Sequence, residues 1–442
     1  MKKNTRKNTT ENIFILGAGV TGLSAGYASG LPVYEAEEVV GGICTSYYMK
    51  PGSSKRLFNA PADGNAYHFE MGGGHWIFGG EREVKKLIAM LSPYKTYERK
   101  SSVYLPSQKR FVPYPLQNNL SFLDDTLAHK AFNEILNPPR RNIQTMKAWL
   151  EVNFGKTLSR LFFNPFHKLY TAGLYTRIAP QDSYKSPIHK EDILRGCEGN
   201  VRSVGYNTRF IYPQNGLDSL TRSLAKKCDI NVGKKITKID LQRKLVFFQD
   251  NSFVKFEKLI STLPLNKVIK MSGLKIGGKP FPSPSVLVVN IGAQKGNKCP
   301  DDHWVYVPKS QSGFHRVGFY SNVDPMFLPS KHRKKRDRVS IYVEKAYQEH
   351  TVLFPKEKNS VARQIIKELQ DWGWIGEIDI FDPTWIETAY TWSWPNSAWR
   401  DEAIRVLEEH NVFQVGRYGR WVFQGIADSM KDGLEIGKKF SS

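Results

Sequence analysis

Three glycines near the N-terminus have the spacing of a phosphate-binding turn. The segment Gly17–Gly22 reads GAGVTG, it follows the apolar run Ile13–Leu16, and Glu35 comes about eighteen residues after its first glycine. In a strand–turn–helix unit, the first glycine allows the tight turn, the second admits a pyrophosphate, and the third lets helix and strand pack closely. The helix N-terminus then offers N–H groups to the phosphates, and the carboxylate accepts hydrogen bonds from a ribose. The pattern predicts dinucleotide binding by Gly17, Gly19, Gly22 and Glu35.

Two later glycine segments favour FAD over NAD as the dinucleotide. Gly41 and Gly42 follow the ribose carboxylate, and Gly73 and Gly74 belong to the segment Met71–His75 (MGGGH). Both segments resemble glycine motifs of the large amine-oxidase-like FAD family, in which the first lines the pyrophosphate and the second passes the isoalloxazine ring. A glycine suits such a place because only a bare backbone fits against a ring face. The resemblance implies FAD as the cofactor and these four glycines as its ligands.

Four segments resemble the UDP-galactopyranose mutases and related nucleotide-sugar mutases, especially the eukaryotic type. They are Gly73–Phe78 (GGHWIF), Phe111–Asn119 (FVPYPLQNN), Asn207–Pro213 (NTRFIYP) and Gly416–Trp421 (GRYGRW). In that family the histidine of the first segment lies beside the reactive nitrogen of the flavin, and the arginine of the last touches the flavin. The asparagine and the aromatic residue of the third segment face the nucleotide. The resemblance therefore assigns His75 and Arg417 to the cofactor, and Asn207 and Tyr212 to the substrate.

Two strand-like segments and one tryptophan complete the candidate substrate site. Trp304–Tyr306 resembles a W-x-Y strand with a substrate-side tyrosine, and Phe314–Asn322 (FHRVGFYSN) resembles a segment whose arginine binds the substrate's diphosphate. An arginine fork suits a diphosphate because it donates two parallel hydrogen bonds. Tyr306 and Arg316 are thus substrate-binding candidates. Trp394 is a further candidate, for stacking on a base or a sugar.

The chain departs from the mutase pattern at positions that would grip the diphosphate. The family's two phosphate-binding tyrosines fall at Trp394 and Phe423, and an asparagine near its C-terminal helix falls at about Ala427. None of these residues supplies a phenolic hydroxyl. The family's second arginine has no secure counterpart, and Lys185 and Arg195 are both candidates. The identities of the nucleotide, the sugar and the second cation stay open.

The resemblance implies a flavin-dependent pyranose–furanose mutase acting on a nucleoside-diphosphate sugar. N5 of reduced FAD would be the nucleophile at the anomeric carbon, with NAD(P)H as reductant and no net redox change. His75 and Arg316 are the candidate catalytic residues. Two alternatives stay open: an FAD-dependent oxidase or desaturase of the amine-oxidase or protoporphyrinogen-oxidase type, and a flavin-binding scaffold without activity.

Composition limits the partners and the cellular setting. The 442 residues carry a formal net charge of +22, which favours anionic ligands, and no nucleic-acid-binding motif accompanies the charge. The dense run 331–338 (KHRKKRDR) is interpreted as a solvated loop, with a phosphate-rich partner as the alternative. Four separated cysteines without a CxxC pair argue against a metal site and for reduced thiols in a cytoplasmic protein. No apolar run is long enough to span a membrane. Loose association with a membrane surface and the oligomeric state are left open.

The elements that must position these residues alternate along the chain. Strands are expected at 12–16, 32–35, 231–254, 258–264 and 284–345, a short helix at 21–28, helices over 81–160, and a closing helix after residue 428. This order predicts an α/β protein: a Rossmann-type FAD-binding domain with a helical insertion and a mixed or antiparallel β-sheet substrate domain. The expected domains are 1–80, 214–272 and 396–442 for FAD, 81–160 for the helices, and 161–213 with 273–395 for the sheet. His68 and Glu70 are expected in a solvated loop.

Overall fold

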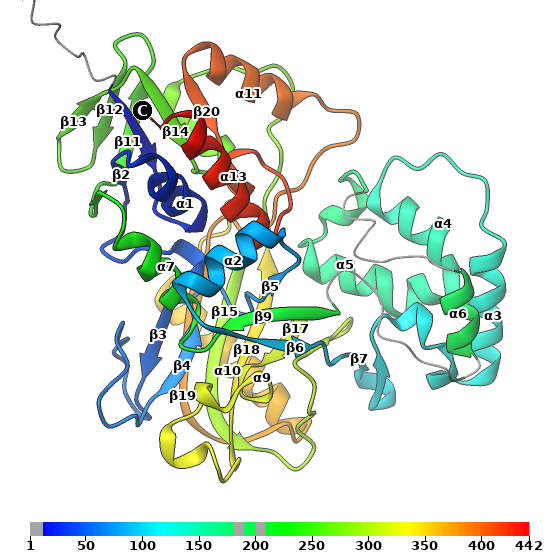
Figure 1. Ribbon diagram of the computed structural model, residues 1–442. Helices are drawn as coiled ribbons and strands as arrows, with labels where there is room; N and C mark the ends of the chain where they lie inside the picture. Colours follow the sequence, from blue (N-terminus) through cyan, green and yellow to red (C-terminus); the bar gives the residue numbers. More distant parts are fainter. Residues whose placement is uncertain (1–11, 181–189, 198, 200–207, 442) are drawn as a thin grey trace, which may run out of the picture. The chain divides into compact units, whose positions relative to one another are not determined.

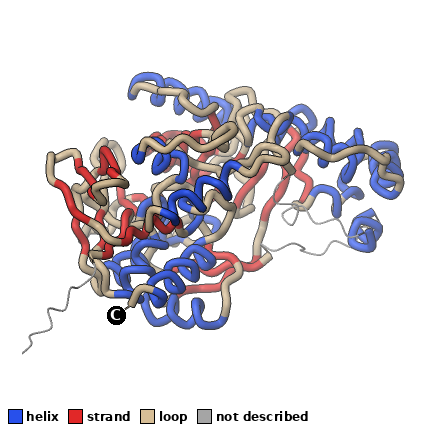
Figure 2. Tube along the Cα trace, turned by 90° about the horizontal axis from the view of Figure 1, so that it is seen from above, coloured by secondary structure: helices blue, strands red, loops and turns tan. Residues whose placement is uncertain are grey.

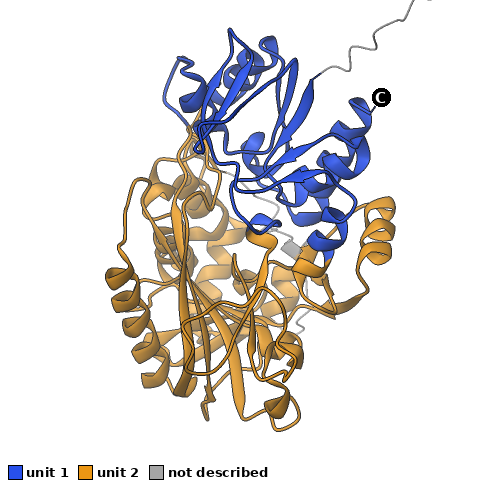
Figure 3. Cartoon of the chain, turned by 90° about the vertical axis from the view of Figure 1, so that its left-hand side faces the viewer, with its two compact units in different colours: residues 1–42, 220–280, 398–442 blue, residues 43–219, 281–397 orange. Residues whose placement is uncertain are grey.

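The computed structural model describes residues 12–180, 190–197, 199 and 208–441 of the chain. It forms two compact units, coloured separately in Figure 3. Unit 1 comprises residues 1–42, 220–280 and 398–442, and unit 2 comprises residues 43–219 and 281–397. The division into three functional domains given above stays a prediction. Asn207 and Lys185 lie outside the described residues.

Unit 1 is built on a five-stranded parallel sheet in the order β10-β2-β1-β14-β20. Its strands are β1 (Ile13–Leu16), β2 (Val33–Tyr34), β10 (Ile230–Asn231), β14 (Lys258–Ser261) and β20 (Val412–Gln414). The apolar sequence of β1 is explained by its central place, because a parallel sheet is covered on both faces. The helices of this unit are α1 (Val20–Ser29), α8 (Leu265–Ser272), α11 (Trp399–Glu409), α12 (Gly416–Gly419) and α13 (Ile426–Lys439), and α7 (Leu217–Ala225) crosses the unit boundary. The predicted Rossmann-type architecture is confirmed.

A small antiparallel sheet completes unit 1. It contains β11 (Ile236–Asp240), β12 (Leu245–Phe248) and β13 (Phe253–Lys255). The alternation of apolar and polar residues predicted strands here, and the structure confirms them.

Unit 2 is built on a seven-stranded mixed sheet in the order β19-β15-β18-β17-β16-β7-β8. Five of these strands, β7, β15, β17, β18 and β19, are labelled in Figure 1. The strands are β7 (Ser101–Leu105), β8 (Arg110–Pro113), β15 (Ser285–Lys295), β16 (Trp304–Tyr306), β17 (Arg316–Phe319), β18 (Arg338–Tyr347) and β19 (Ile375–Ile386). All neighbours pair antiparallel except β16 and β7. This sheet confirms the expected mixed β architecture.

The two faces of the seven-stranded sheet differ in chemistry. Alternate residues of its strands, among them Leu287, Val317 and Val343, pack in one apolar cluster with Ile365 and Leu369 of α10 (Pro355–Asp371). The intervening residues point to the other face, because side chains alternate along a strand. That second face therefore carries the polar residues described below.

Four helices form a separate cluster in unit 2, seen at the right of Figures 1 and 2. They are α3 (Asp125–Leu136), α4 (Met146–Leu158), α5 (Asn164–Tyr170) and α6 (Lys190–Cys197). Their apolar side chains share one core with residues of β7 and β8. The prediction of helices throughout 81–160 was wrong over 94–113, where three strands occur, and the helices continue beyond residue 160. The prolines of the segment 101–113 disfavour a helix, and its β-branched and aromatic residues favour strands once a sheet edge is available to pair with.

Two small sheets and two short helices complete unit 2. One sheet pairs β3 (Ser46–Met49) with β4 (Tyr67–Glu70), and the other orders β5 (Ile77–Phe78), β9 (Arg209–Pro213) and β6 (Tyr94–Glu98). The helices are α2 (Arg82–Leu91) and α9 (Tyr320–Val323). Within the described residues, no helix is both long and apolar enough to cross a bilayer. The four cysteines are all free thiols.

Candidate functional site

The glycine turn of unit 1 leads directly from β1 into α1. Gly17 has a φ of 94°, a left-handed conformation that favours glycine. A Cβ atom built on Gly22 would lie 1.9 Å from the backbone oxygen of Gly17, so the third glycine is required for the helix to approach the turn. Gly19 is the N-cap of α1, and no side chain caps this helix end. Because the cap residue is a glycine, it leaves the first N–H groups of α1 to a bound anion.

The remaining residues of the predicted dinucleotide site gather around the same turn. One carboxylate oxygen of Glu35 accepts from the backbone N–H of Ala18 at 2.6 Å, and the other accepts from that of Glu37 at 3.0 Å. Gly41 forms a parallel bridge with Gly19, and a Cβ on Gly42 would stand 3.6 Å from the Cα atom of Gly19. A Cβ on Gly19 would meet nothing within 4 Å. This open space at an uncapped helix end fits the pyrophosphate of a dinucleotide.

Arg417, the predicted flavin-contacting arginine, lies on α12 of unit 1. Its guanidinium carbon is 4.7 Å from the centre of the Phe423 ring and 5.7 Å from that of Tyr418. Phe423 thus packs against the arginine. It stands at one of the two positions at which the mutases that this sequence resembles have a tyrosine. The contact of Arg417 with flavin stays a prediction.

In unit 2, the polar face of the seven-stranded sheet carries the predicted diphosphate arginine. Arg316 pairs in register with Tyr306 on one neighbouring strand and with Glu344 on the other, so all three side chains belong to one face. The Arg316 guanidinium forms an ion pair with the Glu344 carboxylate and lies 5.9 Å from the ring centre of Tyr342. Burial opposes ionisation of Glu344, but Arg316 and His315 outweigh it and lower the pKa of the carboxyl.

The glycine segment before His75 packs against this polar face. A Cβ on Gly74 would lie 1.9 Å from the Tyr342 hydroxyl, and one on Gly73 would lie 3.2 Å from a carboxylate oxygen of Glu344. The glycine expected here is thus required because the Tyr342 ring leaves no space for a side chain at Gly74. Contact of these glycines with flavin stays a prediction. His75 is half-buried, with Nδ1 3.4 Å from the backbone oxygen of Gly73.

Aromatic side chains flank the Arg316–Glu344 pair. Tyr306 is half-buried, with its ring centre 4.7 Å from that of Tyr114 and 5.4 Å from that of Phe166 on α5. Tyr390 donates its hydroxyl to Glu344 at 3.2 Å. Trp394 packs against the apolar cluster that the helices share with residues of β7 and β8. The substrate-binding roles of Tyr306 and Trp394 stay predictions.

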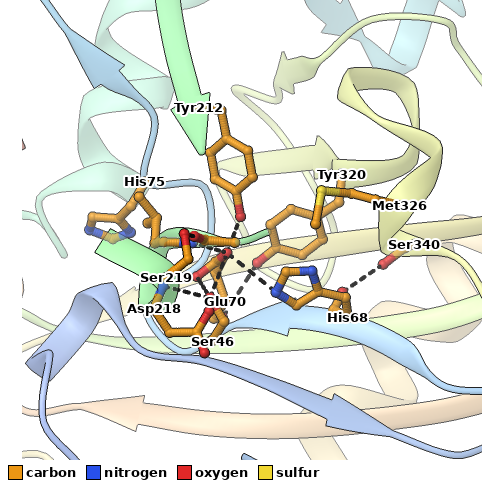
Figure 4. A network of polar contacts seen from close by, with 12 residues as sticks. Ser46, His68, Glu70, His75, Tyr212, Asp218, Ser219, Tyr320, Met326 and Ser340 are labelled. Atoms are coloured by element: carbon orange, nitrogen blue, oxygen red, sulfur yellow. Dashed lines mark hydrogen bonds and ion pairs between the residues drawn. The ribbon is translucent and has the colours of Figure 1, made fainter. Parts of the chain in front are cut away.

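Tyr212 belongs to a second polar network in unit 2, shown in Figure 4. Its hydroxyl donates to the carboxylate of Glu70, which also accepts from the Ser46 hydroxyl at 2.9 Å. The expectation that His68 and Glu70 lie in a solvated loop was wrong, because both are in β4 and 0% exposed. Burial lowers the pKa of His68 to about 3, so its 3.7 Å contact with Glu70 is not an ion pair at neutral pH. Tyr212 is itself 1% exposed, and its role toward a substrate stays a prediction.

The network at Glu70 predicts a pH-dependent stability. Burial raises the pKa of Glu70 from 4.5 to about 8. The folded protein therefore holds this proton more tightly than the unfolded chain, and the carboxyl's contribution to stability is present below about pH 4.5 and lost as pH rises through about 8. Between these two pH values the free energy of unfolding of the wild type should fall by up to about 1.4 kcal/mol per pH unit. The substitution Glu70→Gln should remove this pH-dependent contribution. Melting temperatures of both proteins from about pH 5 to 8 should converge or cross as pH rises, and parallel curves would contradict the assignment.

Sequence reasoning missed Glu344, Tyr390 and Glu70. A signal for Glu344 exists in the segment RVSIYVEKAY, where a carboxylate alternates with aromatic residues inside an otherwise apolar strand. The other two residues had no such signal, because their partners lie far away in the sequence. Arg195 forms ion pairs with Glu191 and Asp192 of its own helix. Where the chain is described, no cluster of three metal-binding side chains occurs.

The basic run 331–338 forms a turn with most of its cations exposed. Arg333 is anchored by its Nε–H, which donates to the backbone oxygen of Leu328 at 3.0 Å, and Arg338 pairs with Asp379 at 2.8 Å. A phosphate-rich partner for this run stays a prediction.

The parallel sheet of unit 1 and the glycine turn between β1 and α1 together define a protein of the dinucleotide-binding Rossmann class. The sequence profile of the flavin-containing amine oxidoreductases matches residues 23–284, which is more than half of the chain. The chain therefore belongs to the flavin-containing amine oxidoreductase family. FAD is the cofactor that fits the dinucleotide site formed by the turn Gly17–Gly22 with Glu35, Gly41 and Gly42.

Solved structures share this fold over nearly the whole chain. Reduced UDP-galactopyranose mutase superposes with a TM-score of 0.83 at 20% identity, over 97% of this chain and 95% of that one. A CLA-producing fatty acid isomerase from P. acnes gives a TM-score of 0.58 at 14% identity, over 98% and 99% of the two chains. A double mutant of putrescine oxidase gives 0.57 at 14% identity, over 97% and 98%. The fold is thus shared by isomerases and an oxidase.

Proposed function

We propose that this protein is an FAD-dependent mutase that interconverts the pyranose and furanose forms of a nucleoside-diphosphate sugar without net redox change. One observation carries the proposal: Arg316 stands on the polar face of the seven-stranded sheet, beside Tyr306 and next to the segment Gly73–His75. A fixed guanidinium suits a leaving diphosphate. The greater fold similarity to a mutase than to an oxidase supports the same conclusion.

The chain's own residues have distinct parts in this proposal. When bound and reduced, with NAD(P)H as the reductant, FAD would provide the nucleophile for the anomeric carbon. Arg316 would hold the diphosphate while the sugar is detached and when it is reattached. The rings of Tyr306 and Phe166, 5.4 Å apart, would limit the access of water to this face of the sheet. His75 adjoins the glycines assigned to the cofactor and would orient groups at the reacting atoms. Asn207, Tyr212 and Trp394 would contact the nucleotide or the sugar.

The proposal places the enzyme in the cytoplasm, in the synthesis of a polysaccharide that contains a furanose sugar. The large positive net charge would help to capture an anionic nucleotide sugar.

An anaerobic assay tests the proposed reaction. The purified holoenzyme is reduced with dithionite and incubated with UDP-, dTDP- and GDP-sugars, and the products are separated by ion exchange and identified by NMR. We expect an isomer of equal mass from one donor, formed only when the flavin is reduced. If no donor isomerises, the mutase function is wrong, and bleaching of oxidised flavin by an amine or a saturated ring would indicate the oxidase or desaturase alternative.

A further inference from the structure

A single buried carboxylate connects three side chains on the polar sheet face of unit 2. One oxygen of Glu344 accepts from the Arg316 guanidinium, and the other lies 3.2 Å from the Tyr390 hydroxyl and 3.4 Å from Nε2 of His315. The Glu344 side chain is 2% exposed, whereas that of Arg316 is 24% exposed. The carboxylate thus lies beneath a cation that reaches solvent.

Glu344 orients Arg316 but engages only part of the hydrogen-bonding capacity of the arginine. A guanidinium has five N–H donors, and the ion pair engages one of its terminal nitrogens. The Arg316 Nε–H is buried and has no hydrogen-bond partner among the residues that the structure describes. A buried donor of this kind favours a ligand that brings an acceptor oxygen.

Tyr390 places a phenolic hydroxyl beside the same guanidinium. Its ring meets that of Tyr170 edge to face, with the centres 4.6 Å apart, which restricts the movement of the ring. The hydroxyl donates to Glu344 at 3.2 Å, and because a hydroxyl proton can rotate, it can also donate to an acceptor oxygen of a bound ligand. Trp394 and Phe423 cannot provide such a hydroxyl.

We propose that Tyr390 is a ligand of the substrate's diphosphate and that Glu344 is the positioning residue that holds Tyr390 and Arg316 for this contact. The inference rests on the proposed function for the class of ligand, a nucleoside diphosphate. Tyr390 supplies the phenol that the two expected positions lack, and it does so from a different point of the chain.

The first test compares Tyr390→Phe with a matched control, Tyr104→Phe. Tyr104 lies on the opposite, apolar face of the same sheet, against Trp372 and Trp374. Calorimetric titration of oxidised holoenzyme with UDP, dTDP, GDP and pyrophosphate should show a Kd about tenfold higher for Tyr390→Phe, as for loss of a hydrogen bond to a charged group. The control should match the wild type, and the affinity for the corresponding nucleoside should not change. A Kd within twofold of the wild type, or an equal loss for the nucleoside, would overturn the role of Tyr390.

The second test asks whether Glu344 acts through Tyr390. Glu344→Gln should also weaken diphosphate binding about tenfold, and Glu344→Asp should recover part of the loss. Because Glu344→Gln already removes the carboxylate that orients the Tyr390 hydroxyl, adding Tyr390→Phe should weaken binding by less than twofold more. Independent effects, which would multiply, would overturn the positioning role. Flavin content and the melting temperature verify that each variant is folded.

These binding measurements are separate from turnover. If diphosphates bind as described but no sugar isomerises, the site stands and the proposed function fails. If an isomer forms but Tyr390→Phe binds diphosphates normally, the proposed function stands and this inference fails.

Discussion

Replacing Arg316 by lysine is expected to lower kcat/KM for the nucleotide sugar by about 10²- to 10³-fold, the cost of losing one fixed electrostatic contact at a reacting group. Lysine keeps the charge that the buried Glu344 requires, so the fold should persist. It cannot form the planar fork that would bind Glu344 and a diphosphate together. The loss should therefore appear in substrate binding and in kcat rather than in stability.

The measurement combines the anaerobic isomerisation assay with melting temperatures and flavin content. Arg363→Lys is the control, because Arg363 is an exposed residue of α10, 5.5 Å from the Phe381 ring centre. The control should retain wild-type kinetics. Undiminished kcat/KM in Arg316→Lys would exclude the proposed role of the guanidinium. The harsher change Arg316→Ala would leave a buried carboxylate unpaired, at a cost of about 3–5 kcal/mol, and is less informative.

The second large effect is expected from Gly22→Ala, which should abolish stable FAD binding and lower the melting temperature. The added methyl group would stand 1.9 Å from the Gly17 backbone oxygen, and neither backbone segment has a flexible side chain that could yield. Overpacking of this kind costs about 1–3 kcal/mol or more. Displacing the turn would also misdirect the N–H groups that receive the pyrophosphate. The ratio of flavin absorbance to protein absorbance after purification reports the loss directly.

Gly19→Ala is the matched comparison in the same turn. A Cβ there meets nothing within 4 Å, and Gly19 has an ordinary φ of −71°, so the apoprotein should melt as the wild type does. FAD affinity should still fall, because the methyl group takes space that a pyrophosphate needs. If Gly19→Ala kept full flavin content, the assignment of the pyrophosphate site to this turn would be wrong. If Gly22→Ala kept both flavin and stability, the close packing of α1 on the turn would be wrong.

The local part of the architecture was predictable because its causes lie within a short stretch of chain. The apolar run of β1, the glycine turn, α1 and the carboxylate of Glu35 all fall within about two dozen residues. Alternation of residue types similarly predicted the strands β15–β18, because one face of that sheet is apolar and the other polar. The strands β6 and β7 were not predicted because they pair with strands more than a hundred residues away. The strand β8 pairs with β7, the strand directly before it, so its place in the sheet follows from that of β7.

The sequence by itself determined that the chain carries a dinucleotide-binding turn, two further glycine segments and an arginine suited to a diphosphate. Only the tertiary structure decided which groups surround that arginine and which carboxylates are buried. Glu344 is 28 residues from Arg316, and Tyr212 is 142 residues from Glu70, so neither pair leaves a local pattern. The register of β17 and β18 brings Arg316 beside Glu344. Tyr212 of β9 reaches Glu70 of β4 only because the fold places these two strands close together. A buried charge or polar group is stable only where the fold supplies its partners, and these partners come together only in the folded chain.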